Sequence, residues 1–232
     1  MKYVASIWIG LTTLVVLAAL LLPGAAAQEY AVDRLDQPAP ADGISAAILE
    51  RLAPHGFRVR RGAKRTVCEI WPCKEWPVES DFEPTDEVLY PFRPGALMGV
   101  LRFRRRGHDF REQKLARGLY TLRYGRQPVD GNHEGTSPTS DFLLLVRADE
   151  DPLAEPMAEE ALSKVSAATA ESSHPAMLCL QPAEDSAADE AATIRYDEAR
   201  DWWIVQFQGT ARAGDKVVAL PVALVVVGHA DE

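Results

Sequence analysis

Residues 118–124, G-L-Y-T-L-R-Y, and residues 141–146, D-F-L-L-L-V, decide the fold. In the first segment Tyr120, Leu122 and Tyr124 alternate with other residues, which places these three side chains on one face of a β-strand. The second segment is apolar at every position after its first residue, which is typical of a strand that is covered on both faces. The polar residues between the two segments predict a loop. This part of the chain therefore predicts two strands of a β-rich domain.

A two-residue period or a short apolar run predicts further strands on both sides of these segments. They lie at residues 57–60, 66–71, 97–104, 177–180, 193–196, 203–207 and 217–227. Residues 72–95 contain five prolines, which exclude a central strand and predict a long surface connection. Helical spacing is restricted to residues 44–52 and to a segment that starts near Pro156.

The order of these segments predicts a mainly β protein. We expect an antiparallel β-sandwich, Ig-like or jelly-roll-like, with one or two short helices. Residues 44–232 are predicted to form this single domain. Residues 28–43 are rich in Pro, Ala and Asp and show no periodicity, so they predict a flexible leader.

The first 27 residues follow the order of a secretory signal peptide. Lys2 precedes an uncharged apolar run at residues 4–22, a Pro-Gly pair interrupts the run, and residues 25–27 are alanines. We expect cleavage near Ala27 and an extracytoplasmic protein, periplasmic or secreted, with no stable membrane span after cleavage. The alternative is a retained anchor, because the run approaches the ~20 residues that cross a bilayer.

The net charge of −9 is unevenly distributed along the chain. Residues 28–147 carry 19 Lys and Arg against 17 Asp and Glu, whereas residues 148–232 carry 5 against 17. The acidic second half argues against nucleic-acid binding, which requires phosphate neutralisation. The one basic run could hold an anionic group, or it could be the solvated face of a hairpin; beside His108 and Asp109 it contains Arg102, Arg104, Arg105, Arg106, Arg111, Lys114 and Arg117.

The loop between the two deciding strands carries the first candidate site. Asp130 and His133 lie on the loop and Asp141 at its exit, and these three could bind a divalent metal ion or transfer protons. The structural alternative is a turn, because Asp-Gly, Asn and Ser-Pro are all turn formers. A Ser137–His133–Asp141 triad is weakly supported, because no nucleophile-elbow motif is present.

Two further residues are candidates for ligand binding near this loop. Arg123 lies on the strand that leads into the loop, and His174 could approach the loop if its strand is a neighbour of the others. The alternative for His174 is an ordinary loop residue before Pro175.

Cysteine and tryptophan residues leave alternatives open. The three cysteines allow one disulfide bond in three ways, with the sequence neighbours Cys68 and Cys73 favoured; buried free thiols are the alternative. Trp71, Trp76, Trp202 and Trp203 could include a sugar-stacking surface. Trp203 is predicted to be in the core, so its neighbour Trp202 must face the other way, exposed or under a loop.

Several blocks of the chain resemble those of an uncharacterised family of exported bacterial β-rich proteins. The blocks are residues 69–71, 95–103, 118–124, 130–133, 137–138, 141–142 and 174–175. The resemblance spans roughly residues 44–180 and implies a bacterial, extracytoplasmic setting. The family has no established activity, so the resemblance implies nothing about chemistry.

Two functions follow from these observations. The first is an extracytoplasmic binding or accessory module for a small-molecule, glycan or protein partner. The second is a metal-dependent or acid/base enzyme centred on Asp130, His133 and Asp141. An enzyme requires these groups to converge in a concave pocket, whereas a binding module requires exposed aromatic side chains or a flat apolar face.

Overall fold

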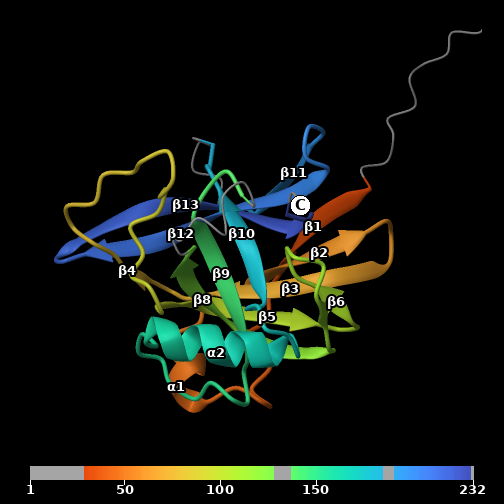
Figure 1. The fold of residues 1–232 in the computed structure, drawn as a ribbon, viewed down its shortest axis with the longest axis horizontal. Coiled ribbons are helices and arrows are strands. Elements are labelled where there is room, and N and C mark those ends of the chain that lie inside the picture. The colour runs from red at the N-terminus through yellow and green to blue at the C-terminus, as the bar shows by residue number, and fades with distance from the viewer. Residues whose placement is uncertain (1–28, 128–136, 185–190, 231–232) are drawn as a thin grey trace, which may run out of the picture.

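A computed structural model describes residues 29–127, 137–184 and 191–230 (Figure 1). The strands are β1 (Tyr30–Leu35), β2 (Gly56–Arg61), β3 (Arg65–Pro72), β4 (Trp76–Pro77), β5 (Leu97–Phe103), β6 (Gly107–His108), β7 (Lys114–Leu115), β8 (Gly118–Arg126), β9 (Asp141–Arg147), β10 (Met177–Gln181), β11 (Thr193–Asp197), β12 (Trp202–Ala213) and β13 (Lys216–Val227). The helices are α1 (Ala46–Leu49) and α2 (Glu159–Thr169).

One large curled sheet contains all of these strands except the β6–β7 hairpin. Its order is β1-β2-β3-β5-β8-β9-β10-β13-β12-β11, with β4 added to β12 in parallel and every other pair antiparallel. The curl brings the two ends of the sheet together: the Tyr30 ring of β1 lies 4.8 Å from the Trp203 ring, on which Tyr196 of β11 also stacks. The mainly β prediction is confirmed, whereas an Ig-like or jelly-roll-like sandwich is not confirmed.

Strand β10 joins the two parts of the sheet. Residues Met177 to Cys179 pair with β9, and the next two residues, Leu180 and Gln181, pair with β13. The chain can therefore pass from one sheet partner to the other within five residues. This exchange explains how the N-terminal and C-terminal strands come to form one sheet.

The strands β8 and β9 form where their sequences predict, and most of their apolar side chains are buried. Tyr120, Leu122 and Tyr124 are buried in the main core. On the other face of β9, Phe142 and Leu144 belong to a second apolar cluster. Helix α2 also lies against β9, and its Thr169 hydroxyl accepts from the Arg147 amide at the end of the strand. Most positions of β9 are therefore buried, which accounts for its apolar sequence.

The predicted flexible leader at residues 28–43 is wrong for its central part. Residues Tyr30 to Leu35 form β1 and pair with β2 along their whole length. Buried Tyr30 and Leu35 anchor the strand at its two ends. The frequent Pro, Ala and Asp residues concealed this strand, because its stability comes from pairing with β2 and not from its own composition.

All four tryptophans that the sequence offered for sugar stacking are buried. Trp203 lies in the main core as predicted, and Trp202 faces a second cluster, beneath the Phe110 ring at 5.2 Å. The indole N–H groups of Trp71 and Trp76 donate to backbone carbonyls, as buried indoles require. The described tryptophans therefore offer no stacking surface.

The three cysteines are buried free thiols, so the favoured Cys68–Cys73 disulfide bond is wrong. Cys68 lies inside β3, which continues to Pro72, so extended chain separates it from Cys73. Extended chain advances about 3.3 Å per residue, which places the two Cα atoms beyond the roughly 7 Å that a disulfide allows.

Among the described residues, no helix combines the length and the apolar character that crossing a bilayer requires.

Candidate functional site

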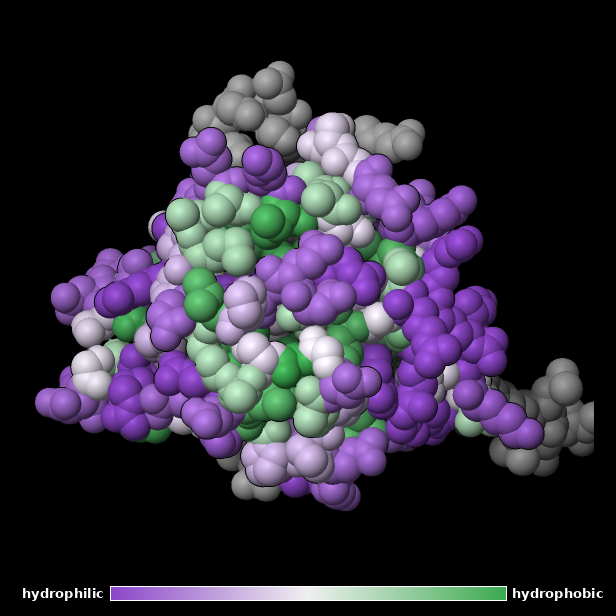
Figure 2. Space-filling model, turned by 90° about the horizontal axis from the view of Figure 1, so that it is seen from below, coloured by the Kyte–Doolittle hydropathy of each residue, from purple (hydrophilic) through white to green (hydrophobic). Residues whose placement is uncertain are grey.

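A cleft with a volume of about 530 Å³ opens at one end of the curled sheet. Its walls come from the start of β1, the β2–β3 turn, the connection from β5 to β6, and the adjacent ends of β12 and β13. Buried apolar side chains form its floor, among them Phe103, Phe110, Trp203 and Val225. The strands β1, β2, β3 and β6 lie on the right of Figure 1, and the same side is strongly hydrophilic in the view from below (Figure 2).

Cationic side chains stand at the rim of this cleft. The rim contains four arginines, Arg61, Arg65, Arg105 and Arg106, and two exposed histidines, His108 and His229. Arg61 is paired with Glu29 and also lies over the Tyr30 ring. The other three arginines are exposed and form no ion pair with any described residue.

The carboxylates that line the cleft are largely committed to other contacts. Glu29 pairs with Arg61, and Asp201 accepts a hydrogen bond of 2.8 Å from the Tyr196 hydroxyl. Asp109 is buried, whereas Glu112 is exposed. The guanidinium groups without a carboxylate partner are thus the groups of the rim that remain available for an anion.

Asp109 fixes the loop that carries part of the rim. Its Oδ1 atom accepts from the Arg111 and Gln113 amides, and its Oδ2 atom accepts from the Gln113 side chain and from the Met177 amide of β10. Burial raises the pKa of the Asp109 carboxyl, and these hydrogen bonds oppose the rise only in part. The side chain therefore holds the β6–β7 hairpin against β10 and has no free oxygen for chemistry.

The basic run predicted from the sequence does not form one patch, and Arg111, Lys114 and Arg117 neither line the cleft nor bind Glu69. Arg105, Arg106 and His108 reach the cleft. Arg102 and Arg104 instead bind the buried carboxylate of Glu69 on β3, together with Arg58 of β2. The Glu69 carboxylate thus neutralises part of the positive charge of these three arginines.

The loop site predicted from the sequence is described only at its exit, because Asp130 and His133 lie outside the described residues. Asp141 is buried at the start of β9, where its Oδ1 atom accepts from the Tyr124 hydroxyl at 2.5 Å and its Oδ2 atom accepts from the Leu89 amide at 2.7 Å. Burial raises the pKa of the Asp141 carboxyl. The carboxylate fastens the proline-rich connection to β8 and β9.

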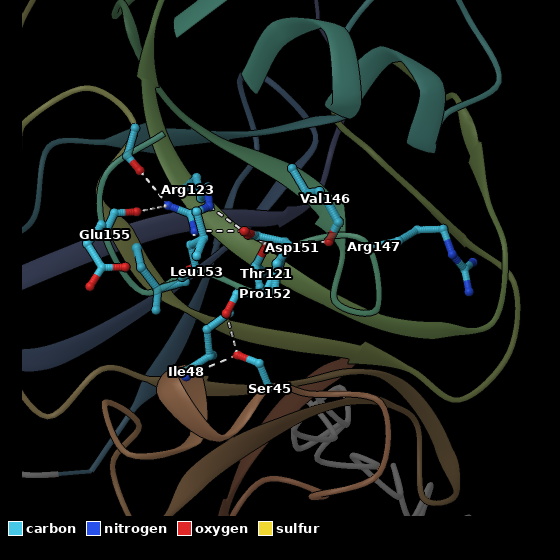
Figure 3. A network of polar contacts seen from close by, with 12 residues as sticks. Ser45, Ile48, Thr121, Arg123, Val146, Arg147, Asp151, Pro152, Leu153 and Glu155 are labelled. Carbon is cyan, nitrogen blue, oxygen red and sulfur yellow. Dashed lines mark hydrogen bonds and ion pairs between the residues drawn. The ribbon is translucent and has the colours of Figure 1, made fainter. Parts of the chain in front are cut away.

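Arg123 is a structural residue in the interior (Figure 3). Its guanidinium forms a two-point ion pair with Asp151, with nitrogen–oxygen distances of 2.6 and 2.8 Å. The remaining donors bind the carbonyls of Gly95, Leu153 and Glu155. Both charged side chains have zero exposure, so Arg123 is not accessible to a ligand. It holds the segment between β9 and α2 against β8.

His174 and Asp141 lie at opposite ends of β9. The register pairs Leu144 with Met177 and Phe142 with Cys179, so the chain before β10 reaches the end of β9 that carries Arg147. Strand β9 has seven residues, which separate the exposed His174 from Asp141 by roughly 20 Å. The described part of the chain does not bring these two candidate residues together.

Ser137, the candidate nucleophile of the weakly supported triad, contacts the Cys179 sulfur, with 3.0 Å between Oγ and Sγ. Both oxygens of Asp141 are engaged elsewhere, as described above. Within the described ranges, no three His, Cys, Asp or Glu side chains are grouped as metal ligands.

No family model, curated protein or solved structure matches the chain. The resemblance to exported bacterial proteins therefore rests on the quoted residues alone, and function has to be argued from the site.

Sequence reasoning missed the parts of the cleft that come from distant strands. Arg61 and Arg65 flank the Gly62 turn, and His229 follows β13. The sequence shows only that two arginines flank a glycine turn. This pattern does not indicate which other part of the chain the arginines face.

Proposed function

We propose that the protein is an extracytoplasmic binding module whose cleft accepts an anionic small molecule. The observation that carries the proposal is the set of three exposed arginines, Arg65, Arg105 and Arg106, at the rim of the cleft. Arg65 begins β3, whereas Arg105 and Arg106 lie in the connection from β5 to β6, and no described carboxylate forms an ion pair with any of the three. Guanidinium groups bind carboxylate, phosphate and sulfate through two parallel hydrogen bonds.

The apolar floor supports binding of a small molecule in the cleft. The cleft volume of about 530 Å³ lies within the range of small-molecule sites. The buried apolar side chains of the floor offer a surface for the non-polar part of an organic anion, while the exposed arginines bind its charged group. The extracytoplasmic location rests on the signal-peptide prediction.

The enzyme hypothesis centred on Asp130, His133 and Asp141 stays a prediction. Its two loop members lie outside the described residues, and Asp141 already serves a structural role. The cleft is therefore the better-supported site.

Anion titrations test the proposed function. The full chain is expressed with export and purified. Binding in the cleft is followed by intrinsic tryptophan fluorescence, to which Trp203 contributes, or by the fluorescence of added anilinonaphthalene sulfonate, with phosphate and sulfate as competitors. Arg65→Gln and the Arg105→Gln/Arg106→Gln double variant are compared with Arg117→Gln, an exposed member of the same basic run that does not line the cleft.

We expect the two cleft variants to lose affinity by at least about tenfold, because hydrogen bonds to charged groups contribute about 1.5–3 kcal/mol each. The Arg117 variant should bind like the unaltered protein, and added salt should weaken binding in all cases. Equal affinity in every variant, or no binding of any of these anions, would contradict the proposal.

A further inference from the structure

The outer part of β13 is a sheet edge with exposed apolar side chains. β12 pairs with β13 as far as Lys216, whereas β10 reaches only Ala223 and Leu224 on the other side. From Lys216 to Val222 no described strand lies along that second edge. Val217 and Val218 are 52% and 48% exposed, and the hairpin projects from the body at the left of Figure 1.

The hydrogen bonds show which backbone groups point out from this edge. The carbonyl of Arg212 accepts from the Val78 amide, on the side of β12 away from β13. Because Arg212 is opposite Val217, this antiparallel pair is not hydrogen-bonded, and the polar groups of Val217 also point outward. The amide of Ala223, six residues along, donates to the Tyr90 hydroxyl and confirms the alternation. Val217, Ala219 and Pro221 therefore present their backbone groups outward, and only Pro221 lacks an N–H.

We propose that this edge pairs in antiparallel fashion with the same edge of a second copy of the chain, about a two-fold axis at Val218. This register places Val217 opposite Ala219 of the other copy, so the outward N–H and C=O groups of both residues are satisfied in two symmetrical pairs. An identical strand is the occupant because the edge is self-complementary in hydrogen bonds and in charge.

The charges at the two ends of the edge agree with this register. Lys216 lies opposite Leu220 of the second copy, and Asp215 lies opposite Pro221, so no like charges face each other. Pro221 and the charged turn also end the pairing after a few residues. The contact is therefore short and reversible, and it lies at the opposite end of β12 and β13 from the anion cleft.

Cysteine cross-linking tests the register directly. In the proposed dimer the two copies of Val218 form the central pair that is not hydrogen-bonded, with Cα atoms about 4.5 Å apart, close enough for a disulfide bond. The two copies of Val217 are displaced along the strands by two residues and are too far apart. With diamide as the oxidant, Val218→Cys should give a covalent dimer at least tenfold faster than Val217→Cys, although the two positions are almost equally exposed. Equal rates would overturn the proposal.

Sedimentation of the purified full chain, expressed with export, provides the second test. The average mass of the unaltered protein should rise above that of the monomer as its concentration increases into the hundreds of micromolar. Ala219→Pro removes an outward N–H and no N–H that pairs with β12, so it should leave the circular dichroism unchanged and the protein monomeric. A monomer at every concentration, or an Ala219→Pro variant that is folded and dimerises normally, would overturn the proposal. If that variant fails to fold, the cross-linking rates decide.

Discussion

Glu69 shows how one buried carboxylate organises the outer side of the sheet. Its side chain has zero exposure, yet it accepts hydrogen bonds from Arg58 of β2, from Arg102 of β5 and from Arg104, which directly follows β5. Burial opposes ionisation, but the hydrogen bonds from the three arginines outweigh it and hold the pKa of the Glu69 carboxyl below its ordinary value. The ionised form is therefore favoured in the folded protein.

Glu69→Gln should lower the free energy of unfolding at pH 7 by about 2 kcal/mol. Removal of one partner from a buried ion pair costs about 3–5 kcal/mol, and the partial exposure of the arginines reduces this value. Because the folded-state pKa is lowered, the stabilisation is present above the unfolded pKa, about 4.3, and is lost as pH falls through the folded pKa. Urea denaturation at pH 7 and pH 3 measures the difference between the two proteins.

The control for this measurement is Glu75→Gln, whose partner Arg212 is exposed. That variant should change the urea midpoint far less. A Glu69 effect of the same size at pH 3 as at pH 7 would show that lost packing, and not charge, is responsible.

The chemical types of the polar residues could be recognised from the sequence, but their partners could not. Asp141 and Arg123 were predicted to bind ligands because an acid at a loop exit and an arginine beside it have the right chemistry for a site. In the structure both hold distant segments: Asp141 binds the Leu89 amide, and Arg123 binds the Asp151 carboxylate. A single sequence does not show contacts across tens of residues.

At the scale of elements, two-residue alternation located most of the strands. It failed where a strand depends on its neighbour, as at β1, and where a strand has only two residues, as at β4. It also underestimated the length of β12, because the strand predicted at residues 203–207 continues to Ala213. Near its end β12 packs against the Trp76 side chain and not against a repetitive hydrophobic face.

Gly209→Ala tests the packing of β4 against β12. A Cβ atom at Gly209 would overlap the six-membered ring of Trp76, which is buried and held by its hydrogen bond to the Met98 carbonyl. We expect a loss of about 2–3 kcal/mol in unfolding free energy, the usual cost of overpacking a core. Gly118→Ala in β8 is the matched control, because its nearest contact would be 3.7 Å, an ordinary distance.

A double-mutant cycle with Trp76→Leu checks the cause. If the clash with the indole is responsible, Gly209→Ala should cost less than about 1 kcal/mol in the Trp76→Leu background. If Gly209→Ala lowers the unfolding free energy equally in both backgrounds, the clash with the Trp76 ring is not the cause.

At the scale of the whole molecule, the cleft is a product of the curl of the sheet. Arg65 and Arg105 are 40 positions apart in the chain, and the floor residue Val225 is much further along. The sequence could predict strands and a basic run, but the strand order that brings these parts together was not encoded in any local pattern. In particular, the change of partner along β10 has no separate sequence signal.

The stability of the whole molecule should be independent of disulfide bonds. The three thiols are buried, and burial raises the pKa of both Cys68 and Cys73 to about 12, so the reactive thiolate form is scarce in the folded protein. A thiol reagent should therefore count three thiols per chain in guanidinium without a reductant, and fewer than one in native buffer. Added reductant should leave the thermal midpoint unchanged, whereas loss of a native disulfide would cost about 2–5 kcal/mol. A count of one thiol in guanidinium would mean that two of the cysteines form a disulfide bond. If these two were Cys68 and Cys73, β3 would have to be disrupted, because extended chain keeps them apart.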